Sequence, residues 1–113
     1  MNHQMKLHDD PFAHIKSGEK TIELRLYDEK RRLLQMGDTI CFTNSKTGDS
    51  LLVEILKLHI FSSFDELYRN LPLLKCGYTE EDVATASPRD MDAYYSPEEQ
   101  QKYGVVGIEL KVL

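Results

Sequence analysis

The side chains with the clearest chemical potential lie close together near the N-terminus. Within residues 18–25, Lys20 supplies an ammonium, Glu23 a carboxylate and Arg25 a guanidinium. Glu23 and Arg25 are two positions apart, so in a β-strand their side chains share one face and lie close enough to pair. Gly18 predicts a turn that frees the direction of Lys20. This set predicts either a donor-rich binding floor with one strong acceptor, or a solvated ion pair worth about 0–1 kcal/mol.

Other patterns of catalytic or metal-binding residues are missing. The sequence holds no phosphate-binding glycine loop, no GxGxxG, no HExxH and no GxSxG. The four histidines do not pair at i,i+4 and lie near no cysteine, so neither a metal ion nor another cofactor is expected. Cys41 and Cys76 form no CxxC pair, and we expect both thiols to stay reduced.

Aromatic and acidic side chains gather in the second half of the chain. Tyr94, Tyr95 and Tyr103 are either core and rim aromatics or stacking platforms for unpaired bases. The carboxylates there have a simpler interpretation, because several stand three positions after a Ser or Thr. A carboxylate in that place closes a capping box at a helix N-terminus. The carboxylates concerned are Glu66, Asp82, Asp90 and Glu99.

The elements that position the charged segment follow from local patterns. Residues 3–7 are compatible with a short strand. Asp10 followed by Pro11 predicts a helix start, with Asp10 as N-cap, and Gly18 predicts its end. Residues 21–27 then alternate between apolar and polar side chains, which predicts a half-buried strand. The charged residues therefore lie where a helix passes into a strand.

Further strands and short helices are predicted downstream. Residues 39–43 and 51–61 indicate a hairpin. Residues 63–103 hold four N-capping patterns and predict a run of short helices. Residues 105–112 return to the alternation that predicts a strand. This order predicts a small, mainly antiparallel sheet or barrel with helices on its ends and edge. The residues expected to face the core are Ile22, Leu24, Ile40, Phe42, Val53, Ile55, Val106, Ile108 and Leu110, with Val112 at the end of the last strand.

Length and charge limit the class of protein. A chain of 113 residues predicts one domain, residues 1–113. No apolar run approaches the ~18 residues of a membrane span, so we expect a cytoplasmic protein without a membrane partner. The net charge of −5 is uneven: residues 1–47 balance to +1 and residues 48–113 to −6. This distribution excludes strong, non-specific coating of duplex DNA but allows a modest basic face. That face would draw on Lys16, Lys20, Arg25, Lys30, Arg31 and Arg32.

Gly18-x-Lys20-x-x-Glu23-x-Arg25 resembles the GxKxxExR signature of the activating signal cointegrator homology (ASCH) domain. The surrounding stretches PFAHIKSGEKTIELRL and LQMGDTICF resemble the opening helix and strand of that family and its Gly-Asp turn, and residues 28–31 and 103–108 resemble bacterial members. The resemblance covers nearly the whole chain. It implies an α+β fold, a small PUA-like, mainly antiparallel β-barrel with several short helices, in which the motif lines a cleft.

The resemblance implies that the domain binds RNA or a nucleotide. In such a pocket Arg25 would form bidentate hydrogen bonds or stack, Glu23 would accept from an exocyclic amine, and Lys20 would approach phosphate. An aromatic side chain from the helical region, Tyr94 or Tyr95, would roof the cleft. The residues expected to bind RNA or a nucleotide are Gly18, Lys20, Thr21, Glu23, Arg25, Arg31, Tyr94 and Tyr95.

Two alternatives stay open at this point. One branch of small bacterial ASCH proteins hydrolyses N4-acetylcytidine, and its motif resembles a lysine followed three residues later by a threonine. Here Lys20 matches the lysine, but Glu23 stands where the threonine is expected and Thr21 is displaced. If the protein is an enzyme, Lys20 and Glu23 are the catalytic candidates, acting through an activated water. The other alternative is a protein-interaction domain that uses the acidic residues 80–99.

Overall fold

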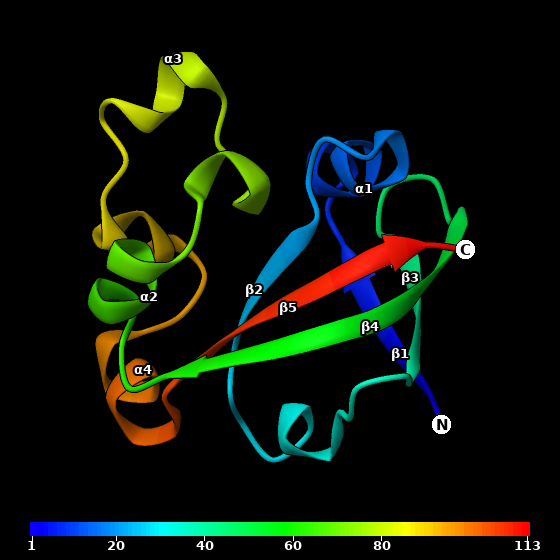
Figure 1. Cartoon of the computed structure of the whole chain (residues 1–113), viewed down its shortest axis with the longest axis horizontal. Helices are drawn as coiled ribbons and strands as arrows, with labels where there is room; N and C mark the ends of the chain where they lie inside the picture. The colour runs from blue at the N-terminus through cyan, green and yellow to red at the C-terminus, as the bar shows by residue number, and fades with distance from the viewer.

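The computed structural model describes residues 1–113, and its five strands form one curled sheet. The strand order is β1-β3-β4-β5-β2. All neighbouring pairs are antiparallel except β1 and β3, which run parallel. The curl makes a half-barrel that leaves β1 and β2 as its two edges (Figure 1). The strands are β1 (Asn2–Leu7), β2 (Ile22–Leu26), β3 (Thr39–Asn44), β4 (Ser50–Phe61) and β5 (Val105–Val112).

Apart from the 3₁₀ helix η1, which lies between β2 and β3, the helices form two groups. One helix, α1, covers one end of the half-barrel, whereas the helices between β4 and β5 gather to one side of the sheet (Figure 1). We call this second group, residues 63–103, the helical layer. No helix in the structure has both the length and the apolar character that a membrane span requires. The α-helices are α1 (Asp9–Ser17), α2 (Phe64–Asn70), α3 (Glu80–Val83) and α4 (Pro97–Tyr103), and the 3₁₀ helices are η1 (Arg31–Leu33), η2 (Leu73–Cys76) and η3 (Pro88–Ala93).

Two apolar clusters hold these parts together. The larger cluster fills the half-barrel beneath α1 and includes Phe42 and Ile55. The smaller lies between β2 and the helical layer, and includes Leu24, Phe64 and Leu67. The α+β fold expected from the sequence is confirmed. Its sheet buries apolar side chains in two separate clusters rather than in one. All nine side chains from Ile22 to Leu110 that the sequence predicts to face the core are buried.

The N-terminal ends of the helical layer follow the hydroxyl patterns. The side chains of Ser63, Thr79, Ser87 and Ser96 each accept a backbone N–H two or three residues later, so all four predicted starts are confirmed. The reciprocal bond from a carboxylate is present in η3 and α4. At α2 the Glu66 carboxylate instead accepts from the Ser62 hydroxyl at 2.8 Å.

Three local expectations need correction. Helix α1 begins at Asp9 with His8 as its N-cap, so Asp10 lies within the first turn rather than capping it. Val112 is 41% exposed, because β5 runs past the apolar cluster at its C-terminal end. The strand β2 is buried on both faces rather than half-buried, since the helical layer covers one face and the β1–α1 side covers the other.

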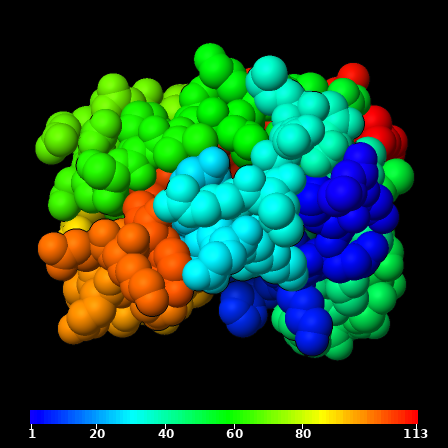
Figure 2. Space-filling view, turned by 90° about the horizontal axis from the view of Figure 1, so that it is seen from below, coloured from blue at the N-terminus to red at the C-terminus, as the bar shows by residue number.

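The connection between β2 and β3 packs against both the half-barrel and the helical layer. On the face in Figure 2 it lies between the N-terminal strand and α4. Its Arg32 guanidinium donates to the Tyr103 carbonyl oxygen at 3.1 Å and lies 4.4 Å from the centre of the Tyr27 ring. This packing fixes the end of β2 against the helical layer, and so helps to hold the charged strand in place.

Candidate functional site

The alternating pattern of β2 turns its charged side chains away from the helical cluster. Leu24 packs among the apolar side chains of the helical layer, and Glu23 and Arg25 point toward the opposite edge of the sheet. There the Arg25 Nη2 donates to the Lys6 carbonyl oxygen of β1 at 2.7 Å. The Arg25 side chain therefore bridges the two edges of the half-barrel.

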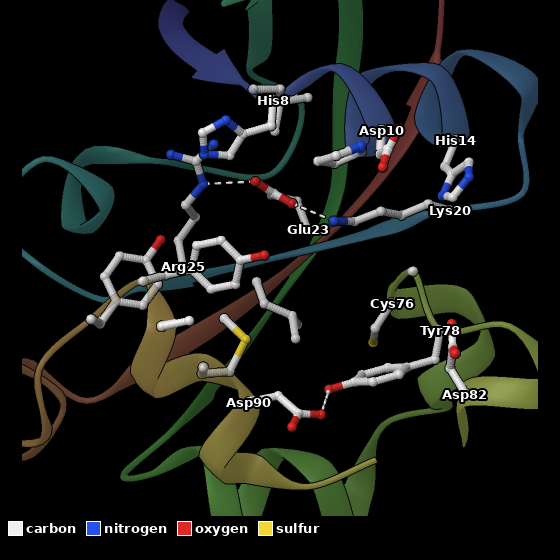
Figure 3. A pocket seen from close by; sticks show the side chains of 18 of the residues that line it. His8, Asp10, His14, Lys20, Glu23, Arg25, Cys76, Tyr78, Asp82 and Asp90 are labelled. Atoms are coloured by element: carbon white, nitrogen blue, oxygen red, sulfur yellow. Dashed lines mark hydrogen bonds and ion pairs between the residues drawn. The ribbon is translucent and has the colours of Figure 1, made fainter. Parts of the chain in front are cut away.

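Lys20, Glu23 and Arg25 form one compact ionic cluster (Figure 3). Lys20 Nζ lies 2.7 Å from Glu23 Oε1, and Arg25 Nε lies 2.7 Å from Glu23 Oε2. Their side chains are 11%, 6% and 13% exposed, respectively. The interpretation of these residues as a solvated surface pair is therefore wrong, because burial removes most of the water that would screen them.

The electrostatics of the cluster keep it ionised. Burial acts to raise the pKa of the Glu23 carboxyl, but the Lys20 ammonium and the Arg25 guanidinium outweigh burial and hold that pKa below its usual value. Burial likewise acts to lower the pKa of Arg25, and the Glu23 carboxylate raises it above its usual value. Two cations and one anion leave the cluster with a net charge of +1.

Two glycines allow Lys20 to reach Glu23. Gly18, at φ +87°, ends α1 in the left-handed conformation, as the sequence predicts. Gly77 also has a left-handed backbone, at φ +109°, and the aliphatic stem of Lys20 lies against it. A Cβ added at Gly77 would come within 3.3 Å of Lys20 Cδ, so a larger residue there would crowd the lysine. The backbone N–H of Thr21 also donates to the Lys75 carbonyl oxygen at 2.9 Å, which attaches the start of β2 to η2.

The ionic cluster retains unused donors. Lys20 Nζ contacts one acceptor, Glu23, and Arg25 Nη1 makes no hydrogen bond within the chain. Both oxygens of Glu23 already accept from a cation. The groups left for a ligand are therefore N–H donors that carry positive charge, and they suit a phosphate, a carboxylate or the carbonyl edge of a base.

The cluster lies in a cleft of about 1070 Å³ between the half-barrel and the helical layer. Pockets that take small molecules commonly measure about 300–1,000 Å³, so the cleft has room for a nucleotide. One wall comes from the end of β1 and from α1, and the other from the helical layer (Figure 3). The side chains of the first wall include His8, Asp10 and His14, and those of the second include Tyr78, Asp82, Asp90 and Tyr94.

A hydrogen-bonded chain stiffens the helical wall. The Tyr68 and Tyr78 hydroxyls lie 2.7 Å apart, and the Tyr78 hydroxyl donates to Asp90 Oδ2 at 2.7 Å. Asp90 also accepts from the backbone N–H of Ser87, which closes the capping box of η3. Burial and these bonds raise the pKa of Tyr78, and the hydrogen bond from Tyr78 lowers the pKa of Asp90. The tyrosine is therefore neutral and the carboxylate ionised near neutral pH.

The predicted site residues divide into two groups. The structure brings Lys20, Glu23, Arg25, Tyr94 and Tyr95 to the cleft. The other three, Gly18, Thr21 and Arg31, do not line it. Gly18 ends α1, Thr21 contributes backbone hydrogen bonds, and the Arg31 guanidinium pairs with the Asp28 carboxylate at 3.1 Å.

Several residues of the cleft do not emerge from sequence reasoning. His8 and His14 lie on the half-barrel wall, and Cys76, Gly77 and Tyr78 lie on the other. Burial raises the pKa of the Cys76 thiol to about 11. One sequence pattern could have indicated this wall of the cleft. Gly77 follows the apolar residues 71–74 closely and predicts a turn, and Tyr78 directly after it places an aromatic side chain at that turn. No group of three or more His, Cys, Asp or Glu side chains is arranged to hold a metal ion.

Fold and site together define the class of protein. A curled, mainly antiparallel sheet with short helices, whose charged edge strand faces a cleft, is a PUA-like α+β domain. The sequence profile described as "ASCH domain" matches residues 5–113, and the chain belongs to this family. A comparison with curated proteins finds no significant match.

Solved structures agree with this assignment. The crystal structure of hypothetical protein PH0355 is 35% identical, with a TM-score of 0.81 over 100% of both chains. The solution structure of protein PF0455 from Pyrococcus furiosus is 33% identical, with a TM-score of 0.74 over 100% of this chain and 98% of that one. The ASCH protein of Zymomonas mobilis shares the fold at 15% identity, with a TM-score of 0.69 over 97% of this chain and 66% of that one.

Proposed function

We propose that this domain binds a nucleotide or an unpaired segment of RNA in the cleft, with Lys20 and Arg25 as the main contacts to the ligand. One observation carries the proposal: a buried ionic cluster of net charge +1 presents unused N–H donors to a cleft of nucleotide size. A fixed cationic donor set at the floor of a cleft recognises anionic and carbonyl oxygens, and nucleotides supply both.

In this proposal Glu23 has a different role from the one expected of it. Because both of its oxygens accept from Lys20 and Arg25, the carboxylate positions the two cations rather than taking an exocyclic amine of the ligand. Membership in the ASCH family supports nucleic-acid-type ligands in general. The acidic residues of the helical layer support the protein-interaction alternative less well, since Asp90 and Glu99 are already engaged in helix caps.

Titration of a nucleotide panel and short RNAs by NMR tests the proposal. The parent protein should bind at least one ligand, and Lys20→Ala should weaken that binding about ten- to a hundredfold, as expected for a lost charge-assisted hydrogen bond. Lys57→Ala is the matched control, because Lys57 is exposed on β4 and does not line the cleft. Arg25→Lys keeps the charge but loses the fork of the guanidinium, and we expect an intermediate loss. Equal binding by the parent and Lys20→Ala would refute the site.

Hydrolysis of N4-acetylcytidine or a related modified nucleoside is the second candidate, favoured by the 2.7 Å contact between Lys20 and Glu23. Two features weigh against it. The lowered pKa of Glu23 makes this carboxylate a weak general base, and the Thr21 side chain does not line the cleft. Incubation of the protein with N4-acetylcytidine, followed by detection of acetate, separates the two functions. We expect no turnover, and an enzyme-like rate would reverse the ranking.

A further inference from the structure

A second, smaller hollow adjoins the cleft. It measures about 280 Å³ and lies between the end of α1 and the short helices η2 and α3. Half of its eight lining residues also line the cleft, so the two spaces are contiguous. The four shared residues are His14, Lys20, Gly77 and Tyr78. The four residues that line the hollow alone are Glu19, Leu74, Thr79 and Glu80.

Lys20 lies at the boundary between the cleft and the hollow. Its aliphatic stem lies against Gly77, which lines both spaces (Figure 3). Its ammonium is held by Glu23 at 2.7 Å and retains N–H donors for a ligand. An anion bound to this ammonium therefore lies at the junction, and groups attached to its two sides reach into the two spaces. A phosphodiester is an anion of this kind, because it carries one charge and joins two groups.

The hollow differs from the floor of the cleft in its charge. Lys20 is its only Lys or Arg side chain, whereas Glu19 and Glu80 contribute carboxylates. Both carboxylates are exposed, and neither forms an ion pair or a hydrogen bond within the chain. They disfavour a second phosphate and suit the N–H groups of a base or the hydroxyls of a sugar. Leu74 and Tyr78 supply apolar and aromatic surface on which a base packs.

The ring of Tyr78 is fixed before a ligand arrives. Its hydroxyl donates to Asp90 Oδ2 at 2.7 Å, and its ring meets the Tyr68 ring at 79° with centroids 5.9 Å apart. A ring held in this way loses little conformational freedom when a ligand packs on it, which favours binding. The junction of the two spaces therefore offers a fixed aromatic ring beside a cation.

We infer that the hollow is a subsite for a second nucleoside, which a phosphodiester bound at Lys20 joins to the nucleotide in the cleft. This inference rests on the proposed function and names the ligand more closely, as two nucleosides joined by one phosphodiester rather than a free mononucleotide. The nucleoside in the hollow is neutral, in keeping with the carboxylates of Glu19 and Glu80. The phosphate charge then lies where the only cation of the hollow is.

Dinucleoside monophosphates test the subsite, with nucleoside methyl phosphates as matched probes. The methyl phosphates keep the charge of the diester but lack the second nucleoside. Titration of the full chain, followed by NMR, should give the best dinucleoside monophosphate a Kd about 5- to 150-fold lower than that of its methyl phosphate, as expected for one more packed base. The backbone amide signals of Leu74 and Thr79 should shift with the dinucleoside and not with the methyl phosphate, because these residues line only the hollow.

Leu74→Ala removes apolar surface from the hollow alone. Leu74 is 46% exposed, so the variant should fold like the parent. It should raise the Kd of the dinucleoside monophosphate about three- to tenfold and leave that of the methyl phosphate unchanged. Leu56→Ala is the matched control, because Leu56 is 41% exposed on β4 and lines neither space. Lys20→Ala should weaken both probes about ten- to a hundredfold, since both place their diester at this ammonium.

The outcomes separate the subsite from the cleft. If the two kinds of probe bind the parent with equal Kd values and Lys20→Ala weakens both, the subsite is wrong and the cleft proposal stands. Equal effects of Leu74→Ala and Leu56→Ala on the dinucleoside monophosphate would also overturn the subsite. If no dinucleoside monophosphate, methyl phosphate or nucleotide binds the parent, the proposed function fails and the subsite fails with it.

Discussion

The half-barrel and the helical layer enclose the cleft from two sides, and different interactions hold each of them. The half-barrel is built by strand pairing between segments far apart in the sequence, around a cluster of thirteen buried apolar residues. The helical layer consists of helices of four to seven residues. All of them except η2 start with a hydroxyl cap, and the layer is anchored through the smaller cluster. Short helices with little buried surface open more readily than sheet strands. The ionic cluster of Lys20, Glu23 and Arg25 therefore lies on the wall built from strands. Most of the aromatic side chains of the cleft lie on the wall built from short helices, which we expect to open more readily.

The largest expected effect comes from removing the anion of the ionic cluster. Glu23→Ala leaves Lys20 and Arg25 buried side by side without a counter-charge, and should lower the free energy of unfolding by about 3–5 kcal/mol. Asp65→Ala is the matched control in the helical layer. Its partner Arg89 lies at 3.4 Å and both side chains are 55% exposed, so we expect a cost of about 0–1 kcal/mol. Urea denaturation measures both, and similar costs would remove the distinction between the two regions.

Two buried phenylalanines test whether the regions unfold separately. Phe42 belongs to the half-barrel cluster and Phe64 to the helical one, and both are fully buried. Each alanine substitution should cost about 3–5 kcal/mol. Amide hydrogen exchange should then differ: Phe64→Ala should speed exchange mainly in residues 63–103, and Phe42→Ala throughout the chain. Uniform acceleration in both variants would show that the domain unfolds as one unit.

Acid should destabilise the charged wall through Glu23. Because the pKa of Glu23 is lower in the folded state, the unfolded state binds more protons as the pH falls. The stabilisation from this group is therefore complete above its unfolded pKa, near 4.5, and is lost as the pH falls through the folded value. We expect the free energy of unfolding to decline less steeply with acid in Glu23→Gln than in the parent. Asp38 and Asp90 also have lowered pKa values, and they remain in both proteins, so the difference isolates Glu23.

The smallest effect concerns the caps of the helical layer. Ser96→Ala removes the hydroxyl of a complete capping box and should cost about 1 kcal/mol, within the usual 0.5–2. Thr79→Ala should cost less, since no reciprocal bond from Asp82 accompanies that cap. Ser45→Ala, in a loop outside the layer, should stay within about 0.5 kcal/mol of the parent. Thermal denaturation followed by circular dichroism ranks the three, and a larger loss at Thr79 would contradict the role of the box.

The amino-acid sequence alone determined the local features of this protein. Alternation placed Glu23 and Arg25 on one strand face, and Gly18 ended α1 as expected. Four hydroxyl residues marked four helix starts. Such features depend on backbone geometry and on hydrogen bonds within a few residues, and a local pattern encodes them directly. The spacing of the motif and its resemblance to the ASCH family also identified Lys20 as part of the charged site.

The tertiary structure decided what surrounds those residues. Alternation does not reveal whether the second face of a strand is covered, and β2 is buried on both faces because the helical layer and the β1–α1 side close over it. The parallel pairing of β1 with β3 and the bridge from Arg25 to Lys6 join strands that are distant in the chain. His8 and Tyr94 meet across the cleft for the same reason. Contacts between distant segments depend on how the whole sheet curls and on which clusters exclude water, and no window of neighbouring residues contains that information.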